Sequence, residues 1–198
     1  MRSYDAPTTA YMQSRGAWLA HIMIWISATD RESGALEEIG FWTGADHADF
    51  TIGGQSRTYY AAGAMLDADP IRLRTGLQVR TQRVRFSQIA PEVQQAIRGY
   101  EPRHKPVQIH RALFDPISEL LIAEPHLVLR GYVDQLQIKT PVEGGEGSVE
   151  MTIATAARAL TRKMGRKRSH ATLTARAPTD DFRKYASIAD KVEVDWGK

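Results

Sequence analysis

The chain has 198 residues and a formal net charge of +3, from 26 Lys and Arg against 23 Asp and Glu. This length suits one compact domain with extensions, and so small a charge does not by itself indicate a nucleic-acid-binding or membrane-surface protein. The absence of cysteine excludes disulfides, thiolate metal sites and cysteine nucleophiles. The longest apolar run, residues 18–26, is too short to span a bilayer, and synthesis in the cytoplasm is expected.

The first half of the chain predicts strands joined by turns. The nearly continuous apolar run over residues 18–29 is typical of a strand buried on both faces, and a second strand at 38–42 completes a hairpin. Gly53 and Gly54 divide residues 49–60 into two short strands, because glycine supplies the positive φ of a tight turn. Over residues 77–86 the apolar side chains shift from odd to even positions, which predicts a β-bulge near 81–83.

The second half predicts one packed helix, three strands and a C-terminal helix. Pro91, Glu92 and Gly99 mark the two ends of a helix over residues 90–99 with one apolar face. Strands are expected at 106–114, 127–138 and 148–153. Thr179 and Asp180 are cap candidates for a short helix reaching residue 189, followed by residues 192–196.

The predicted fold class is mainly β, a sandwich or barrel with one packed helix and a small C-terminal helical arm. Three regions are expected along the chain. Residues 1–17 form a polar N-terminal arm, residues 18–156 form the β-rich core domain, and residues 157–198 form a basic segment followed by a C-terminal arm.

Residues that could carry chemistry are few, and none predicts a cofactor. The six histidines have no familiar metal-ligand spacing. Asp46, His47 and Asp49 form the nearest acid–base cluster, but the sequence favours a solvated hairpin loop there. Glu143 and Glu146 lie in a glycine-rich loop that is poorly suited to hold paired carboxylates. The pairs at 53–54 and 144–145 favour turns over phosphate binding.

The strongest local electrostatic feature is a basic segment that places six cations in eleven residues: Arg158, Arg162, Lys163, Arg166, Lys167 and Arg168. It could contact phosphates, but no aromatic residue interleaves with the cations, and a solvated or partner-facing segment is the favoured interpretation. Trp18, Trp25, Trp42 and Trp196 are large apolar anchors, and Trp196, near the end of the chain, is predicted to anchor an interface.

From Gly99 onward the chain resembles tail proteins of long-tailed, siphovirus-like bacteriophages of α-proteobacteria and of related gene transfer agents. The resemblance lies in the order and spacing of short segments rather than in one signature. These segments are Lys105–Val107, Leu113–Asp115, Arg130–Tyr132, Val149–Ile153, Ala157–Leu160 and Arg166–Ser169, followed by Pro178, Asp181, Phe182, Tyr185 and Trp196–Gly197.

The resemblance implies a non-enzymatic structural subunit of the viral tail tip with a tail-tube-like β-sandwich or barrel. It would be a baseplate hub subunit in a trimeric or hexameric ring of the virion, joining the tail tube or distal tail ring above to tail-tip or fibre proteins below. The ring would line the DNA-delivery channel, with transient contact to genomic DNA. Some related hubs hold a cysteine-bound iron–sulfur cluster, which this cysteine-free chain would lack.

Three alternatives remain open at the level of sequence. The first is a distal tail protein that forms a hexameric adaptor ring. The second is a tail-associated envelope hydrolase, which would use either Asp46, His47 and Asp49 or Glu143 and Glu146. The third is a nucleic-acid-binding accessory protein that would use the basic segment, and it predicts salt-dependent DNA binding.

Overall fold

The structure is a computed structural model that describes residues 4–61, 64–71, 78–88, 90–140, 147–161 and 169–186. The chain divides into two compact units, residues 1–160 and 161–198. The division falls close to the predicted end of the core domain at residue 156. Each unit is described by itself.

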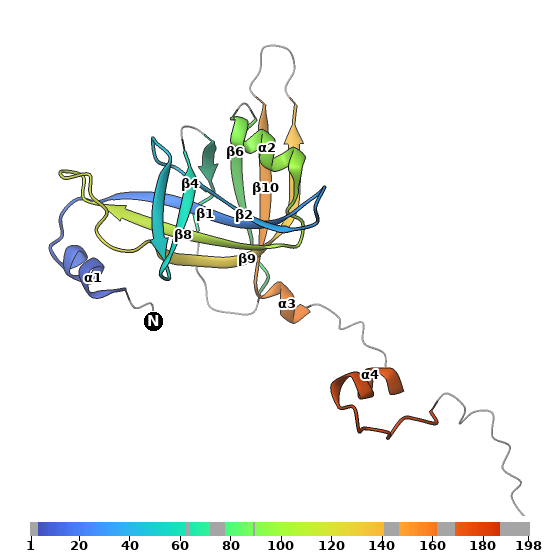
Figure 1. The fold of residues 1–198 in the computed structure, drawn as a ribbon. Coiled ribbons are helices and arrows are strands. Elements are labelled where there is room, and N and C mark those ends of the chain that lie inside the picture. Colours follow the sequence, from blue (N-terminus) through green and yellow to red (C-terminus); the bar gives the residue numbers. More distant parts are fainter. Residues whose placement is uncertain are drawn as a thin grey trace, which may run out of the picture. The chain divides into compact units, whose positions relative to one another are not determined.

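A single ten-stranded sheet makes up most of the first unit (Figure 1). Its strands run in the order β3-β4-β2-β1-β8-β9-β10-β6-β5, and β7 pairs with β1. Neighbours are antiparallel except for the parallel pair β2 and β4. The mainly β fold class is confirmed. The strands are β1 (Leu19–Asp30), β2 (Leu36–Trp42), β3 (Ala48–Ile52), β4 (Gln55–Tyr60), β5 (Met65–Ala68), β6 (Thr81–Ser87), β7 (Tyr100–Glu101), β8 (Pro106–Phe114), β9 (His126–Lys139) and β10 (Ser148–Thr155).

The sheet bends so that two of its parts face each other across the main core. The rings of Phe41 in β2 and Phe86 in β6 lie 5.2 Å apart, although four strands separate β2 from β6 in the strand order. In Figure 1, β1 and β8 cross the direction of β6 and β10 at a steep angle. Facing layers of this kind enclose a core as in a β-sandwich, here made from one continuous sheet.

Helix α2 (Pro91–Gly99) closes one side of the main core, as the sequence predicts. Pro91 stands at the start, where its missing N–H is not needed, and Glu92 lies in the first turn, where a carboxylate favours the helix dipole. Val93 is buried, and Ala96 and Ile97 pack against the core. Full burial of a valine side chain contributes roughly 1.5 to 3 kcal/mol, which fixes this short helix in place.

Strand β1 is buried on both faces, as its continuous apolar sequence predicts. Ile24 and Ile26 point into the main core, whereas Met23 and Trp25 belong to a second, aromatic cluster on the opposite face with Trp42, Phe50 and Tyr59. Gly40 of β2 allows this packing, because a Cβ there would lie 2.8 Å from both Trp25 and Tyr59. Two-sided burial makes β1 the central strand of the fold.

The predicted bulge near residues 81–83 is wrong. β6 begins only at Thr81 and pairs with β10 without a register shift over its whole length. Val79 lies before the strand, half exposed, and Leu77 lies outside the described residues. Gln82 takes an inward position and donates from its side-chain amide to the carbonyl of Asp69. The apparent shift of apolar positions therefore arises because Val79 precedes the strand, while Gln82, Val84 and Phe86 keep one inward phase within it.

The N-terminal region contains a helix that the sequence analysis did not predict, α1 (Ala6–Gln13). Thr8 is buried, and the Tyr11 hydroxyl donates to the carbonyl of Ala17 at 2.8 Å. The ring of Tyr4 lies 4.7 Å from that of His126 in β9. Tyr4 thus contacts the sheet, while most other residues of 4–17 are exposed.

The C-terminal helix lies earlier in the chain than predicted. Helix α4 (His170–Arg176) begins after Ser169, whose Oγ accepts from the N–H of Thr172 at 3.3 Å. Residues 182–186 form turns, and Asp180 accepts from the N–H of Phe182 at 3.1 Å in a local turn. Residues 187–189 and 192–196 lie outside the described residues. Ser169, and not Thr179 or Asp180, is therefore the residue that caps the C-terminal helix.

Candidate assembly interface

Large apolar side chains are exposed together at one end of the β1–β8 pair. Leu19, which opens β1, pairs with Phe114, which ends β8. The loop after β8 exposes Ile117 by 93% and Leu120 by 69%. We call this group the apolar rim, and its members are Met12, Trp18, Leu19, Ile117 and Leu120.

The loop that carries Ile117 and Leu120 is held by its own hydrogen bonds. The Asp115 carboxylate accepts from the N–H of Ile117 at 2.9 Å, which lowers the pKa of Asp115. The main-chain N–H of Asp115 donates to the carbonyl of Leu120 at 3.0 Å, and Glu119 adopts a positive φ of 57°. Beyond this turn, Phe114 and Leu121 form a β-bridge. The two exposed side chains therefore stand on a fixed backbone.

Helix α1 belongs to the same end of the molecule. Burial and the nearby Asp115 carboxylate raise the pKa of the Tyr11 phenol, so Tyr11 lies close to the loop. Met12 follows in α1, and its carbonyl accepts from the N–H of Arg15 at 3.3 Å. Three chain segments thus converge on the apolar rim: α1, the start of β1 and the loop after β8.

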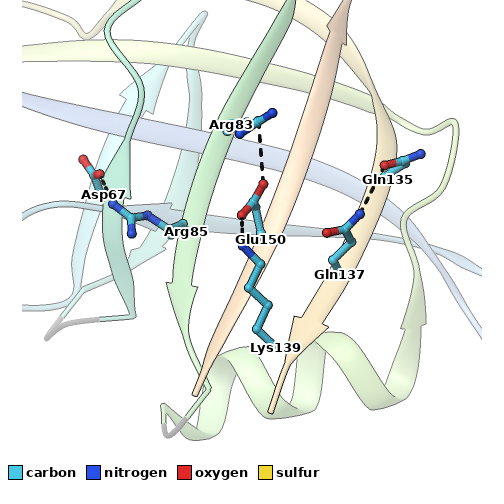
Figure 2. Close-up of polar contacts among 7 residues, drawn as sticks. All are labelled: Asp67, Arg83, Arg85, Gln135, Gln137, Lys139 and Glu150. Carbon is cyan, nitrogen blue, oxygen red and sulfur yellow. Dashed lines mark hydrogen bonds and ion pairs between the residues drawn. The ribbon is translucent and has the colours of Figure 1, made fainter. Parts of the chain in front are cut away.

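A second surface, on the outer face of β5, β6, β10 and β9, is a charged ladder of alternating sign (Figure 2). Arg85 contacts Asp67 at 2.6 Å, while Glu150 contacts both Arg83, at 3.7 Å, and Lys139. Hydrogen bonding to Lys139 lowers the pKa of Glu150. The alternating residues Val84, Phe86, Val149 and Met151 point the other way, into the main core. Opposite charges satisfy one another across this face.

The predicted acid–base cluster is divided among separate structural contacts. The ring of His47 accepts at Nδ1 from the N–H of Ala61 at 3.0 Å. Asp49 accepts from the Thr58 hydroxyl at 2.6 Å, and the carbonyl of Asp46 accepts from the Trp42 indole at 3.0 Å. These contacts position the β3–β4 hairpin. Glu143 and Glu146, the other carboxylates of the hydrolase alternative, lie outside the described residues.

Arg158 is the member of the basic segment that the structure describes. It opens the short helix α3 (Arg158–Thr161) and forms an ion pair with Asp134 of β9. The other five cations, Arg162, Lys163, Arg166, Lys167 and Arg168, and the predicted anchor Trp196 lie outside the described residues. The first cation of the segment thus contacts the protein's own sheet.

The tryptophans and glycines named in the sequence lie at positions that serve packing or turns. Trp25 and Trp42 are buried in the aromatic cluster, whereas Trp18 is half exposed on the apolar rim. Gly53 and Gly54 both have positive φ, so their predicted turn is confirmed; the second glycine pair, 144–145, lies outside the described residues. In the part of the chain that the structure describes, His, Asp and Glu side chains form no group of three able to hold a metal ion.

No pattern in the sequence predicted the apolar rim as a site. A signal existed in Ile117 and Leu120, which follow Pro116 in a loop and not in a predicted strand. Among the described helices none is long and apolar enough to cross a membrane.

The fold and the rim define a mainly β protein with an exposed apolar end. No protein-family model matches the sequence, and no curated protein is significantly similar to it.

Proposed function

We propose that this chain is a structural, non-enzymatic subunit of the tail tip of a long-tailed bacteriophage. In this proposal it is a baseplate hub subunit whose ring joins the tail tube to the distal receptor-binding machinery and lines the DNA-delivery channel. The observation that carries the assembly part of the proposal is the apolar rim. Exposed apolar groups of this size, gathered on a fixed backbone, are characteristic of surfaces that bind another protein.

Three of the segments that carry the phage-tail resemblance lie in and around β8 and β9. Lys105–Val107 leads into β8, and Leu113–Asp115 ends that strand and opens the loop of the apolar rim. Arg130–Tyr132 lies in the middle of β9, the next strand of the sheet. These three segments and the exposed surface thus share one part of the sheet, which supports the rim as the contact between subunits.

The exposure of the C-terminal unit is a second observation that supports the proposal. Residues 169–186 contain no buried residue, and Phe182 is 87% exposed. A seven-residue helix such as α4 is marginal in water unless an apolar face packs against something. A neighbouring subunit would supply that surface in a ring.

Sedimentation of the purified full chain tests the assembly step. We expect a concentration-dependent trimer or hexamer, and the double variant Ile117→Asp with Leu120→Asp should shift it to monomer while circular dichroism shows an unchanged fold. Leu36→Asp is the matched control, because Leu36 is an exposed leucine at the other end of β1, opposite Thr29. A monomeric wild-type chain, or equal disruption by the control, would contradict the role of the rim.

Reconstruction of the tailed particle encoded with this chain tests the placement. The proposal expects density for the chain in a closed ring at the distal end of the tail tube. A sixfold adaptor ring directly below the tube would support the distal tail alternative over the hub. A particle that holds the chain as a monomer away from the tail would overturn both.

A further inference from the structure

A polar cavity of about 620 Å³ lies on the face of the sheet that carries the aromatic cluster. Its walls come from the β3–β4 hairpin, from β8, from β9 and from the segment before α1. Pockets of this size hold small-molecule ligands in many proteins. Neither the apolar rim nor Arg158, the described cation of the basic segment, contributes to its lining.

The inner wall of the cavity is built from hydrogen-bond donors. Arg57 of β4 donates from its guanidinium to the side-chain oxygen of Gln108 at 3.1 Å, and the guanidinium lies over the ring of Trp25 at 5.0 Å. Opposite Gln108 in the sheet register stands Arg130 of β9. The fork of a guanidinium fixed in this way is shaped to bind the two oxygens of a carboxylate or phosphate.

His110 of β8 is the buried polar group of this wall. It is 2% exposed, lines the cavity, and its Nδ1 makes no hydrogen bond to any residue that the structure describes. Burial and, to a lesser extent, the positive charges of Arg57, Arg130 and His126 lower the pKa of His110 to about 4. A buried imidazole nitrogen without a hydrogen-bond partner, close to cations, is costly unless something compensates it.

The carboxylates of the cavity do not compensate these cations. Asp5 and Glu124 line it, but one oxygen of Glu124 accepts from the N–H of Gly53 at 2.6 Å, at the tip of the β3–β4 hairpin. Neither carboxylate is among the charges that act on His110. In the described part of the chain, Arg57 and Arg130 form no ion pair with a carboxylate. The inner wall is therefore positive and open to a ligand.

We propose that this cavity is a binding site for a small oxyanion, a carboxylate or phosphate group held by Arg57, Arg130 and Gln108 beside His110. The anion would complete the hydrogen bonding of the guanidinium groups and offset the positive field at the imidazole. Because the bound charge favours the protonated imidazole, His110 takes up a proton more readily in the complex. Binding should then tighten as the pH falls from 7 towards 5.

The test follows the imidazole resonances of the isotopically labelled full chain by NMR during titration with sodium phosphate or sodium citrate. Sodium chloride at matched ionic strength is the reference. We expect a saturable shift of the His110 signals with at least one of the two oxyanions, and comparison of the two arms tells which group the site prefers. No saturation with either, or the same shift with chloride, would overturn the proposal.

Variants separate the site from general surface charge. Arg130→Gln removes an exposed guanidinium and should weaken binding about tenfold, the loss expected for one charged hydrogen bond. Arg98→Gln is the matched control, an exposed arginine on α2 outside the cavity, and should leave affinity unchanged. Equal weakening by both variants contradicts the proposal. Since Arg57 also packs on Trp25, Arg57→Gln is informative only where the thermal unfolding midpoint is retained.

This inference does not depend on the proposed function. The Ile117→Asp and Leu120→Asp variant changes the apolar rim but no residue of the cavity, so it should bind the oxyanion as the wild type does. Loss of assembly and loss of anion binding can therefore be read separately.

Discussion

In the charged ladder Arg83 and Arg85 each contact a carboxylate, whereas in the polar cavity Arg57 and Arg130 contact none among the described residues. Both regions lie on faces of the same sheet and both are rich in arginine. The ladder neutralises itself across neighbouring strands, so it needs nothing beyond solvent. The cavity leaves its positive charges uncompensated beside a buried histidine. The two surfaces differ in whether their arginines have carboxylate partners, not in how many arginines they carry, and the arginines without such partners belong to the proposed binding site.

Acid should destabilise the cavity side of the sheet more than any other part of the described chain. The pKa of His110 is near 4 in the folded protein against an ordinary value of 6.5. Between pH 6.5 and 4 the unfolded chain therefore binds a proton at this imidazole that the folded chain does not bind. The free energy of unfolding decreases accordingly as the pH falls from 6.5 towards 4. The shift corresponds to about 3 kcal/mol. Denaturant unfolding at a series of pH values measures it.

The matched variant for this prediction is His110→Gln, which keeps a polar side chain but cannot titrate. Its free energy of unfolding should vary less over the same pH range, whatever its absolute stability. If the variant and the wild type lose the same amount between pH 6.5 and 4, His110 is not the source of the acid sensitivity.

A smaller effect is expected from the hydroxyl of Tyr59, in the aromatic cluster behind the cavity. Burial raises the pKa of Tyr59 to about 12, although the nearby Arg57 guanidinium partly opposes this. The hydroxyl has no hydrogen-bond partner among the residues that the structure describes, so Tyr59→Phe removes a polar group that these residues leave unsatisfied. We expect the variant to be as stable as the wild type or more stable by up to about 1 kcal/mol. Substantial destabilisation in thermal unfolding would reveal a partner for this hydroxyl.

The smallest effect should come from the charged ladder. Glu150→Gln removes the carboxylate shared by Arg83 and Lys139, but both cations are exposed, so their interactions are screened by water and salt. We expect a slight loss of stability at low salt that disappears at high salt. The pKa of Glu150 is lowered in the fold, so its contribution is present at neutral pH and fades in acid. A loss of stability that persists in high salt would show that Glu150 stabilises the fold by more than screened surface charge.

Local patterns in the sequence predict most of the strands and the packed helix. β1 is recognisable because its apolar run needs two buried faces, and α2 because Pro91, Glu92 and Gly99 mark its ends. The bulge prediction was wrong because the strand begins only at Thr81: Val79 precedes it, and the polar Gln82 hides the inward phase that Val84 and Phe86 continue. The prediction placed the C-terminal helix too late because it took Thr179 and Asp180 as the cap, whereas Ser169 caps the observed helix.

The polar cavity could not be predicted, because its residues meet only through the strand order. Arg57 and Gln108 are 51 positions apart in the chain, and Arg130 faces Gln108 only because β8 and β9 pair in one particular register. Periodicity gives the exposed and buried sides of a strand but not its neighbours. The apolar rim is different, because Ile117 and Leu120 lie three positions apart in one loop. Their apolar character outside a predicted strand can be read from the sequence.

The position of β1 at the centre of the sheet sets a constraint on how the chain folds. β1 can pair with β2 as soon as their hairpin is made, but its other edge pairs with β8, which begins at Pro106, and β6 waits for β10, which begins at Ser148. Contacts between such distant segments form slowly, because the intervening chain loses entropy before they contribute. Until β8 arrives, the most apolar strand of the protein presents an unpaired edge, and chain concentration and chaperone supply during synthesis should then govern the yield of folded subunits.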